Sequence, residues 1–306
     1  MKGVLPEMKI LLLGSTGMLG SDCKLALERE HEVLAPDRKK LDIVSWDNVI
    51  ETMQRVLPDA VINCAGMADI NECESDELSL RKINVEGPRN LAQGCARFDC
   101  RLIHISSYCV YNGLKSIPQP YFEDDTVDPL SSYGSGKVFS ETAVRENAPH
   151  YIIIRTGWLY GINGKNFVTN ILLKALEGGR KKQTIQVEED QYGSPTWTYR
   201  LAYQIREMLR EDVHGTYHAT SEGYCNLLDF ARAVLDKLNI KANLKGQKTS
   251  QISKHVPIVC NGILENRLLK KQGINIMQDW KTDLDLFLDQ NGEELIKRIK
   301  NQLKQG

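Results

Sequence analysis

Short hydrophobic runs alternate with longer amphipathic segments through the first half of the chain. Five of these runs predict buried strands: Lys9–Leu13, Glu32–Leu34, Ala60–Asn63, Arg101–Ile105 and Tyr151–Arg155. The segments between them place hydrophobic residues at helical spacing, and strands that alternate with helices form a parallel sheet with helices on both faces. We therefore predict an α/β fold, a Rossmann-like doubly wound parallel sheet.

Three of the intervening helices can be bounded from the sequence. One ends near Arg29, a second covers Trp46–Val56 after a capping Ser45, and a long third covers Ser75–Phe98 with a kink near Gly87. These lengths suit the crossover helices of a doubly wound sheet.

The pattern becomes less regular beyond Thr156. Helices are predicted at 166–177, 198–209, 227–238 and 293–303, and strands at 184–187 and 215–219. We expect residues 1–165 to form a dinucleotide-binding domain. Residues 166–306 are expected to form mainly a smaller, interleaved substrate-binding lobe, in which residues from about 184 to 219 return to the main sheet.

Composition narrows the class of protein. The chain has 306 residues, of which 42% are hydrophobic, so it can bury a sizeable core. Its 39 basic and 40 acidic residues predict no general attraction to nucleic acid or to a membrane surface. The eight cysteines form no Cys-x-x-Cys pair and no run approaches ~18 uncharged apolar residues, so reduced thiols and a cytoplasmic location are expected.

A glycine-rich turn follows the first predicted strand directly. Its sequence is Gly14-Ser-Thr-Gly17-Met-Leu-Gly20, and a helical pattern comes next. In such a turn Gly14 permits the tight bend, Gly17 allows a pyrophosphate to approach the backbone, and Gly20 allows the helix to pack closely on the strand. Because the flanking elements are the required ones, this turn predicts a dinucleotide site at the helix N-terminus.

The charged segment after the second strand bears on the choice of cofactor. Asp37 could accept a hydrogen bond from the ribose 2′-hydroxyl of NAD(H), whereas Arg38 and Lys39 could bind the 2′-phosphate of NADP(H). The two cations favour NADP(H), and the use of NAD(H) stays open.

A tyrosine and a lysine lie one helical turn apart within Ser131-Ser-Tyr-Gly-Ser-Gly-Lys137. Side chains four residues apart share a helix face, so Tyr133 and Lys137 can point into one site. A nearby ammonium favours the phenolate and is expected to lower the pKa of Tyr133. The pair therefore predicts proton-transfer chemistry, and Ser107 reaches the same sheet edge from the end of the fourth strand.

These features, taken in order, resemble the extended short-chain dehydrogenase/reductase family, and within it the dTDP-4-dehydrorhamnose reductases. The resemblance covers about Lys9 to Ala219 and more weakly extends to Leu288. It is carried by the glycine turn, Leu41–Ile43, Asn63–Gly66, Ser106–Gly113, Tyr133–Lys137, Arg155–Gly161 and Asp190–Thr196.

The resemblance implies a role for each matching residue. Tyr133 would protonate the substrate oxygen, Ser107 would hydrogen-bond the same oxygen, and Lys137 would hold the nicotinamide ribose. Trp158 would stack on the sugar of a nucleotide-sugar substrate. Further cofactor contacts are implied for Gly14, Thr16, Gly17, Met18, Leu19, Arg38, Lys39, Asp42, Ile43, Cys64, Ala65 and Asn84.

The implied reaction is NAD(P)H-dependent reduction of the 4-keto group of a deoxysugar nucleotide, of the dTDP-4-dehydrorhamnose to dTDP-rhamnose type. Sugar dehydratases of this family carry an Asp-Glu pair directly after the catalytic hydroxyl, where this chain has Tyr108 and Cys109, so reduction is favoured over dehydration. A nucleotide-sugar epimerase remains an alternative. So does a non-catalytic partner similar to the regulatory subunit of methionine adenosyltransferase.

Two segments depart from the reductase pattern. Met67, Ala68 and Asn71 replace a stretch that bears Tyr, Thr and Asp, and the Arg-Pro and Asn-Ser signature is reduced to Val256-Pro257 and Cys260-Asn261. The missing arginine removes a cation that a sugar diphosphate needs, and Lys254 and His255 are the candidates to replace it.

The sequence gives little support for a metal ion. His214 and His218 lie four apart in a predicted strand, which favours a structural role over metal ligation. A homodimer is only the general expectation for enzymes of this kind.

Overall fold

The computed structural model describes residues 7–181, 183–211, 213–251 and 257–305. A six-stranded sheet forms its centre, with the strand order β10-β5-β4-β3-β1-β2. The strands are β1 (Lys9–Leu13), β2 (Glu32–Leu34), β3 (Ala60–Asn63), β4 (Arg101–Ser107), β5 (Tyr151–Thr156) and β10 (Gly215–His218). All neighbours pair in parallel, which confirms the predicted Rossmann-like sheet.

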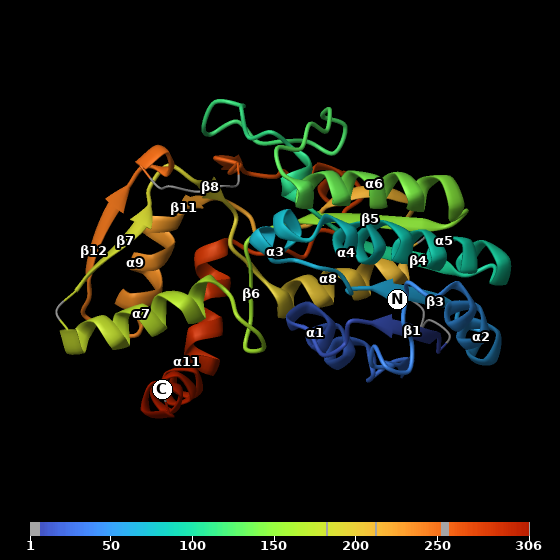
Figure 1. The fold of residues 1–306 in the computed structure, drawn as a ribbon, viewed down its shortest axis with the longest axis horizontal. Helices are drawn as coiled ribbons and strands as arrows, with labels where there is room; N and C mark the ends of the chain where they lie inside the picture. The colour runs from blue at the N-terminus through green and yellow to red at the C-terminus, as the bar shows by residue number, and fades with distance from the viewer. Residues whose placement is uncertain (1–6, 182, 212, 252–256, 306) are drawn as a thin grey trace.

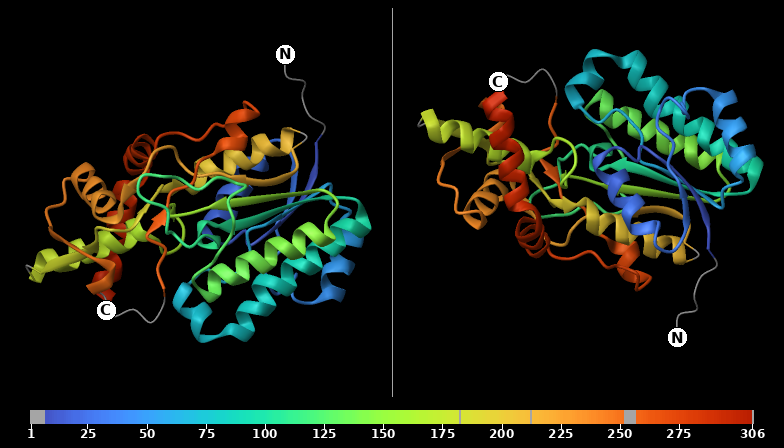
Figure 2. Two further views of the ribbon diagram at one scale, coloured as in Figure 1. Left: turned by 90° about the horizontal axis from the view of Figure 1, so that it is seen from above. Right: turned by 90° about the horizontal axis from the view of Figure 1, so that it is seen from below.

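Helices cover both faces of this sheet (Figure 2). On one face α1 (Met18–Leu27) and α8 (Thr198–Arg210) enclose a core that includes Ile10, Leu12 and Ile154. On the other face α2 (Trp46–Val56), α5 (Gly87–Phe98) and α6 (Ser132–Asn147) enclose a second core. Because both faces are buried, the central strands β1 and β3 are hydrophobic almost throughout instead of alternating.

The segment predicted as one helix over 75–98 is divided into four. It begins earlier, with α3 (Ile70–Ser75), and continues through α4 (Glu77–Arg81), a π-helical turn (Lys82–Glu86) and α5. Asp76 ends the first piece with φ −132° and caps the second, because its carboxylate accepts a hydrogen bond from the Ser79 backbone N–H at 3.0 Å. Sequence periodicity did not reveal these interruptions, since the hydrophobic positions continue across them.

The remaining elements form a second unit beside the sheet, drawn with α7, α9 and α11 in Figure 1. Its helices are α7 (Phe167–Lys181), α9 (Leu227–Lys237) and α11 (Trp280–Gln305), whereas α10 (Arg267–Lys271) packs on β10 of the main sheet. Its short strands are β6 (Leu159–Tyr160), β7 (Thr184–Glu188), β8 (Tyr192–Gly193), β9 (Thr196–Trp197), β11 (Cys225–Asn226), β12 (Asn243–Gln247) and β13 (Asn261–Gly262).

The segment expected to return to the main sheet does so only in part. β10 is an edge strand of the six-stranded sheet and α8 packs on α1, but β7 pairs with β12 in a separate two-stranded sheet. The side chains of β7 explain this, because Ile185 and Val187 bury in the core of the second unit.

The last helix is much longer than predicted. It starts at Trp280, where Asp279 accepts hydrogen bonds from the backbone N–H groups of Lys281 and Thr282 at 3.0 and 3.2 Å. The buried Asp283 pairs with Arg200 at 2.9 Å, so a charged residue in this segment belongs to the core. No helix among the described residues has both the length and the hydrophobicity to cross a membrane.

Candidate active site

The loop from β1 into α1 forms a cradle of backbone atoms. Gly14 adopts φ +73°, and a β-carbon there would lie 2.7 Å from the backbone nitrogen of Ala65. At Gly20 a β-carbon would collide with the Gly14 carbonyl group. The predicted turn and close packing are therefore both present.

Helix α1 begins immediately after this turn with its N-terminal N–H groups uncapped by a side chain. Its N-cap is Gly17, which has no side chain to accept a hydrogen bond from the first N–H groups of the helix. A helix N-terminus in this state favours an anion through both its N–H groups and its dipole. The turn therefore fits the pyrophosphate of a dinucleotide.

A cavity of about 220 Å³ opens beside the cradle. Of the residues expected to bind a cofactor, it is lined by Gly14, Thr16, Arg38, Asp42, Ile43 and Ala65. Pro36, Asp37, Leu41, Gly66, Met67 and Ile83 are among its other lining residues. The apolar Ile43 and Ala65 suit the faces of a base, and the exposed Arg38 provides a cation at the rim.

Other residues from the expected set are placed differently. The Leu19 side chain is only 6% exposed and belongs to the core between α1 and α8, so a cofactor could reach only its backbone. Met18 packs against the loop before α7, where the Asn166 amide donates to its sulfur at 3.6 Å. Lys39 and Cys64 do not line the cavity, and Cys64 instead hydrogen-bonds Cys23.

Asn84 supports the cavity wall through a pair of hydrogen bonds. Its buried side chain accepts from the Met67 backbone N–H at 2.8 Å and donates to the Met67 carbonyl oxygen at 2.9 Å. A β-carbon on the neighbouring Gly66 would lie 3.1 Å from Asn84 Oδ1 and 3.8 Å from Lys137 Nζ. The cavity wall therefore lies directly beside the ammonium group of Lys137.

Helix α6 presents Tyr133 and Lys137 on one face, as expected. Lys137 is buried, its Nζ donates to the Ile105 carbonyl oxygen at 2.9 Å, and it lies 5.8 Å from the centre of the Tyr133 ring. Burial lowers the pKa of Lys137 to about 8, while the carboxylate of Glu141 opposes this shift.

The expected lowering of the Tyr133 pKa does not appear. Burial raises it above its usual range, the nearby Cys109 adds to the rise, and a hydrogen bond from Ser107 opposes it. Desolvation of the buried phenol is the largest of these influences. Tyr133 is therefore a neutral phenol at neutral pH, which is the form that can donate a proton.

Ser107 completes this group from the end of β4. Its side chain is buried and accepts a hydrogen bond from the Cys109 backbone N–H at 3.2 Å, and it lies close enough to Tyr133 to oppose the rise in the pKa of that phenol. The fold thus joins Ser107, Tyr133 and Lys137, although 30 positions separate the first from the last.

A buried ion pair behind α6 was missed by the sequence analysis. Arg155 donates to Glu141 at 2.9 and 2.7 Å, and the Ser106 hydroxyl donates to the same carboxylate at 2.5 Å. Glu141 lies one further turn along the face that carries Tyr133 and Lys137, so the same four-residue spacing could have indicated it. Its role is to fix α6 against β4 and β5.

Trp158 follows β5 with φ +48° and lies at the junction with the second unit. Its carbonyl oxygen accepts from the Thr196 backbone N–H at 3.1 Å, and its indole packs against Gly193. Gly157, the residue before Trp158, packs against the ring of Tyr108, the residue that follows Ser107.

The sequence matches the model of the RmlD substrate binding domain over residues 8–292. The chain belongs to the RmlD substrate binding domain family. The matched residues include the motifs of the first half of the chain and most of the irregular second unit.

Characterised relatives cover most of the chain. The spore coat polysaccharide biosynthesis protein SpsK of Bacillus subtilis is 30% identical over 92% of this chain and 97% of its own. The dTDP-4-dehydrorhamnose reductase of Mycobacterium tuberculosis is 30% identical over 90% and 91%. The dTDP-4-keto-6-deoxy-D-glucose reductase of Streptomyces niveus is 36% identical over 72% and 76%.

Solved structures agree with this membership. The dTDP-4-dehydrorhamnose reductase of Bacillus anthracis in complex with NADP superposes with a TM-score of 0.88, at 28% identity over 93% of this chain and 100% of its own. A dTDP-4-dehydrorhamnose reductase from Clostridium acetobutylicum gives 0.87, at 32% identity over 92% and 99%. The UDP-glucose 4-epimerase of Thermus thermophilus, at 16% identity and a TM-score of 0.79, shares the fold alone.

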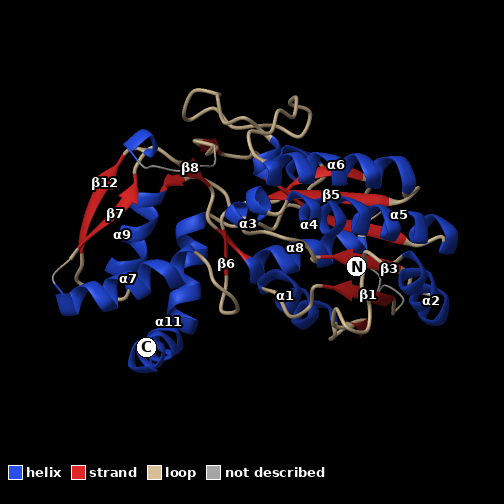
Figure 3. Cartoon of the chain, in the orientation of Figure 1, coloured by secondary structure: helices blue, strands red, loops and turns tan. Residues whose placement is uncertain are grey.

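Against this family background, the reduced signature near the C-terminus has a structural role. The amide of Asn261 donates to the carbonyl oxygens of Lys115 at 3.1 Å and Gln119 at 2.9 Å. Both acceptors lie in the long loop between β4 and α6, which appears in tan at the top of Figure 3. Asn261 therefore attaches this loop to β13.

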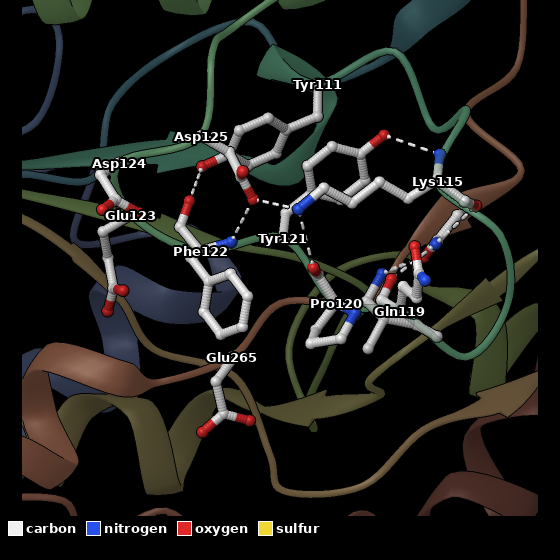
Figure 4. Close-up of polar contacts among 12 residues, drawn as sticks. Tyr111, Lys115, Gln119, Pro120, Tyr121, Phe122, Glu123, Asp124, Asp125 and Glu265 are labelled. Atoms are coloured by element: carbon white, nitrogen blue, oxygen red, sulfur yellow. Dashed lines mark hydrogen bonds and ion pairs between the residues drawn. The ribbon is translucent and has the colours of Figure 1, made fainter.

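Lys115 holds the same loop closed (Figure 4). Its ammonium donates to the Pro120 carbonyl oxygen at 3.1 Å, pairs with the Asp125 carboxylate and lies 4.8 Å from the centre of the Tyr121 ring. Asp125 also accepts from the Phe122 backbone N–H at 2.7 Å. A half-buried cation thus organises a loop that is mostly without regular secondary structure.

The remaining predicted positions can be placed briefly. Lys254, His255 and Val256 lie outside the described residues. His218 is buried, where it hydrogen-bonds the Tyr111 hydroxyl at 2.9 Å and the Glu265 carbonyl oxygen at 3.1 Å. In the part of the chain that the structure describes, no three His, Cys, Asp or Glu residues are grouped to hold a metal ion.

Proposed function

We propose that this protein reduces the 4-keto group of a dTDP-activated deoxysugar with NADPH, in a reaction of the dTDP-4-dehydrorhamnose to dTDP-rhamnose type. The observation that carries the proposal is that the fold brings Ser107 close to Tyr133, with Lys137 one helical turn further along α6 and beside the cofactor cavity. The names of the relatives point to the same chemistry.

The cofactor site fits NADP(H). The glycine cradle and the free N-terminus of α1 suit the pyrophosphate, and the cavity lined by Asp42, Ile43 and Ala65 suits the adenosine. Arg38 lies at the rim, where it would pair with a 2′-phosphate. The related reductase of Bacillus anthracis binds NADP. When bound, this cofactor supplies the hydride.

The side chains of the chain would handle the proton and the substrate oxygen. Tyr133, neutral at neutral pH because burial raises its pKa, donates its hydroxyl proton to the oxygen of the former carbonyl. Ser107 hydrogen-bonds that oxygen and fixes its position relative to Tyr133. Lys137 binds the nicotinamide ribose with its buried ammonium and places positive charge near the developing oxyanion.

We assign the two units different tasks. Residues 1–165 bind the dinucleotide, and residues 166–306 bind mainly the sugar nucleotide, apart from α8 and β10, which complete the sheet layer. Trp158 lies at their junction, where its indole would stack on the sugar. We place the reaction in the cytoplasm, because all eight cysteines are free thiols in the described residues.

We further propose that two copies associate through the outer face of α4 and α6. This face exposes the large side chains of Leu130 and Phe139, the latter at 61%. It also carries both Arg81 and several glutamates, so a second copy could pair opposite charges across a twofold axis. Sedimentation of wild type and Phe139→Glu would test this, because a dimer should dissociate in the variant.

A substrate panel tests the proposed reaction. Purified protein is incubated with NADPH and several 4-keto sugar nucleotides, and the loss of nicotinamide absorbance is followed. We expect turnover with a dTDP-4-keto-6-deoxysugar, confirmed by identification of the 4-hydroxy product. Absence of turnover with every member, in the presence of normal NADPH binding, would contradict reduction and favour the non-catalytic binding protein.

A further inference from the structure

A chain of hydrogen bonds crosses the buried layer between the sheet and α6. At one end, the backbone N–H of Ala65 in the cavity wall donates to Asn63 Oδ1 at 3.1 Å. The amide nitrogen of Asn63 lies 3.2 Å from Nδ1 of His104, and Nε2 of the same ring lies 2.9 Å from the Ser140 hydroxyl. At the other end, that hydroxyl donates to the Lys137 carbonyl oxygen at 2.7 Å. Asn63 and His104 are each 1% exposed and Ser140 is fully buried, so solvent does not compete for these bonds.

The two ends of the chain fix the direction of every hydrogen bond within it. A backbone N–H only donates, so the Ala65 N–H takes the Asn63 oxygen and leaves the Asn63 amide nitrogen facing His104. Nδ1 of His104 therefore accepts, and the ring hydrogen lies on Nε2, which donates to Ser140. Burial, and then the nearby Lys137 ammonium, hold the pKa of His104 well below its usual range. The ring is therefore neutral and keeps both roles.

Lys137 is held at both of its ends by neighbouring residues of β4. The His104 side chain reaches the Lys137 backbone carbonyl through Ser140. The next residue, Ile105, accepts from the Lys137 ammonium through its own carbonyl oxygen at 2.9 Å. One strand thus positions both the backbone and the charge of this lysine.

We propose that His104 is a positioning residue that holds Lys137 in place relative to the cofactor wall at Ala65, and that it thereby sets the affinity of the protein for NADPH. This inference rests on the proposed function, in which Lys137 binds the nicotinamide ribose. His104 takes no part in proton transfer, because both of its ring nitrogens are bonded within the core. A buried histidine of this kind can serve the core alone, but the two partners of His104 lead to residues on both sides of the cofactor site.

The mildest test removes the link between His104 and Lys137. Ser140→Ala deletes one hydroxyl and keeps the imidazole and the lysine, so we expect the Kd for NADPH to rise about fivefold, the size expected for one lost hydrogen bond. The Kd for dTDP-glucose, which has no 4-keto group to reduce, should stay close to that of wild type. Calorimetric titration with each ligand measures both constants without turnover.

Ser75→Ala is the matched control for this substitution. The Ser75 hydroxyl also donates to a carbonyl oxygen three residues earlier, that of Glu72 at 3.0 Å, but it is exposed on α3. This variant should change neither constant.

A double-mutant cycle shows whether Ser140 acts through Lys137. In a Lys137→Met background the contact to the ribose is already lost, so Ser140→Ala should weaken NADPH binding no further. Multiplication of the two effects would overturn the inference, because Ser140 would then act independently of the lysine.

Two substitutions test His104 itself. His104→Phe keeps a ring but has neither donor nor acceptor, so the Kd for NADPH should rise about tenfold. His104→Gln can place an amide donor near the position of Nε2 and should restore most of this affinity. If His104→Phe does not fold, the comparison of His104→Gln and Ser140→Ala with wild type still decides the question.

The inference is also overturned if folded Ser140→Ala binds NADPH as wild type does, or if its affinities for NADPH and dTDP-glucose fall equally. Failure of the proposed reaction is recognised separately. Wild-type protein that binds NADPH but reduces none of the 4-keto sugar nucleotides would contradict the reduction. The NADPH titrations would still support or overturn the role of His104, because they need no turnover.

Discussion

The proposed cofactor side and the proposed sugar side of this site differ in construction, because one is formed mainly by backbone atoms and the other mainly by side chains. The cofactor side uses the backbone: a left-handed Gly14, an uncapped helix terminus and a wall held by Asn84. The sugar side uses side chains, with Tyr108 and Trp158 packed against glycines and a loop held by Lys115. A binding surface formed by backbone atoms requires a few glycines at fixed spacing. A binding surface formed by side chains can keep its shape when the contacting residues are exchanged for others.

The largest expected effect on activity comes from Tyr133, where the cofactor side and the sugar side meet. Tyr133→Phe removes the proton donor and keeps the ring, so kcat should fall by about 10²- to 10⁴-fold. The Kd for NADPH should stay close to that of wild type, since the cavity does not include this hydroxyl. Stopped-flow reduction and fluorescence titration measure the two quantities. If Tyr133→Phe lost NADPH binding instead, we would assign Tyr133 to cofactor binding.

The backbone cradle should be sensitive to a single methyl group. Gly14→Ala combines a strained φ with a collision against Ala65, so NADPH affinity should weaken by about 10- to 100-fold. Gly273→Ala is a matched control, because Gly273 has φ +70° and no atom within 4 Å of a β-carbon. Calorimetry should show normal NADPH binding for the control. Equal losses in both variants would mean that strain alone, and not the shape of the cradle, accounts for the effect.

The pH dependence of kcat/KM should report on Lys137. The pKa of its ammonium is lowered to about 8 in the free protein, so the charged form dominates below pH 8 and is lost above it. If the charge is needed, kcat/KM falls above pH 8 and is about tenfold lower by pH 9. In Lys137→Arg the decrease should disappear, since arginine stays charged. A decrease that persists in this variant would assign it to another group.

Selectivity between the two nicotinamide cofactors should depend on one cation. Arg38→Ala should reduce the preference for NADPH over NADH by about tenfold, because a charge-assisted contact to the 2′-phosphate is lost. Lys39→Ala is the control, since this exposed neighbour does not line the cavity. Steady-state kinetics with both cofactors measures the ratio. An equal change in the two variants would show that Arg38 contributes only a general electrostatic attraction to the cofactor.

The smallest effect on activity should come from the loop attachment. Asn261→Ala removes two hydrogen bonds to the loop between β4 and α6, so the free energy of unfolding should fall by about 1–3 kcal/mol. The KM for the sugar should rise severalfold while NADPH binding is unchanged. Asn243→Ala, whose exposed amide contacts Thr184, should change neither quantity. A loss of NADPH affinity in Asn261→Ala would show that the loop serves both sides.

The same contrast explains which features the sequence could predict. The parallel sheet, the glycine turn and the trio of Ser107, Tyr133 and Lys137 follow from hydrophobic runs and from fixed spacings. The predicted direction of the Tyr133 pKa shift was wrong, because this pKa depends mainly on how deeply the phenol is buried, and burial is not encoded locally. The loop organised by Lys115 was not predicted, since its contacts join residues that no periodicity relates.

The π-helical turn at Lys82–Glu86 makes the proposed cofactor site depend on the number of residues in this segment. Such a turn holds one residue more than a regular helix, and here it carries Asn84, which clamps the wall at Met67. Deleting one residue before Asn84 would restore a continuous helix and turn the amide by about 100° away from that wall. A relative that has one residue fewer at this position would therefore need a different contact to support the wall of its cofactor cavity.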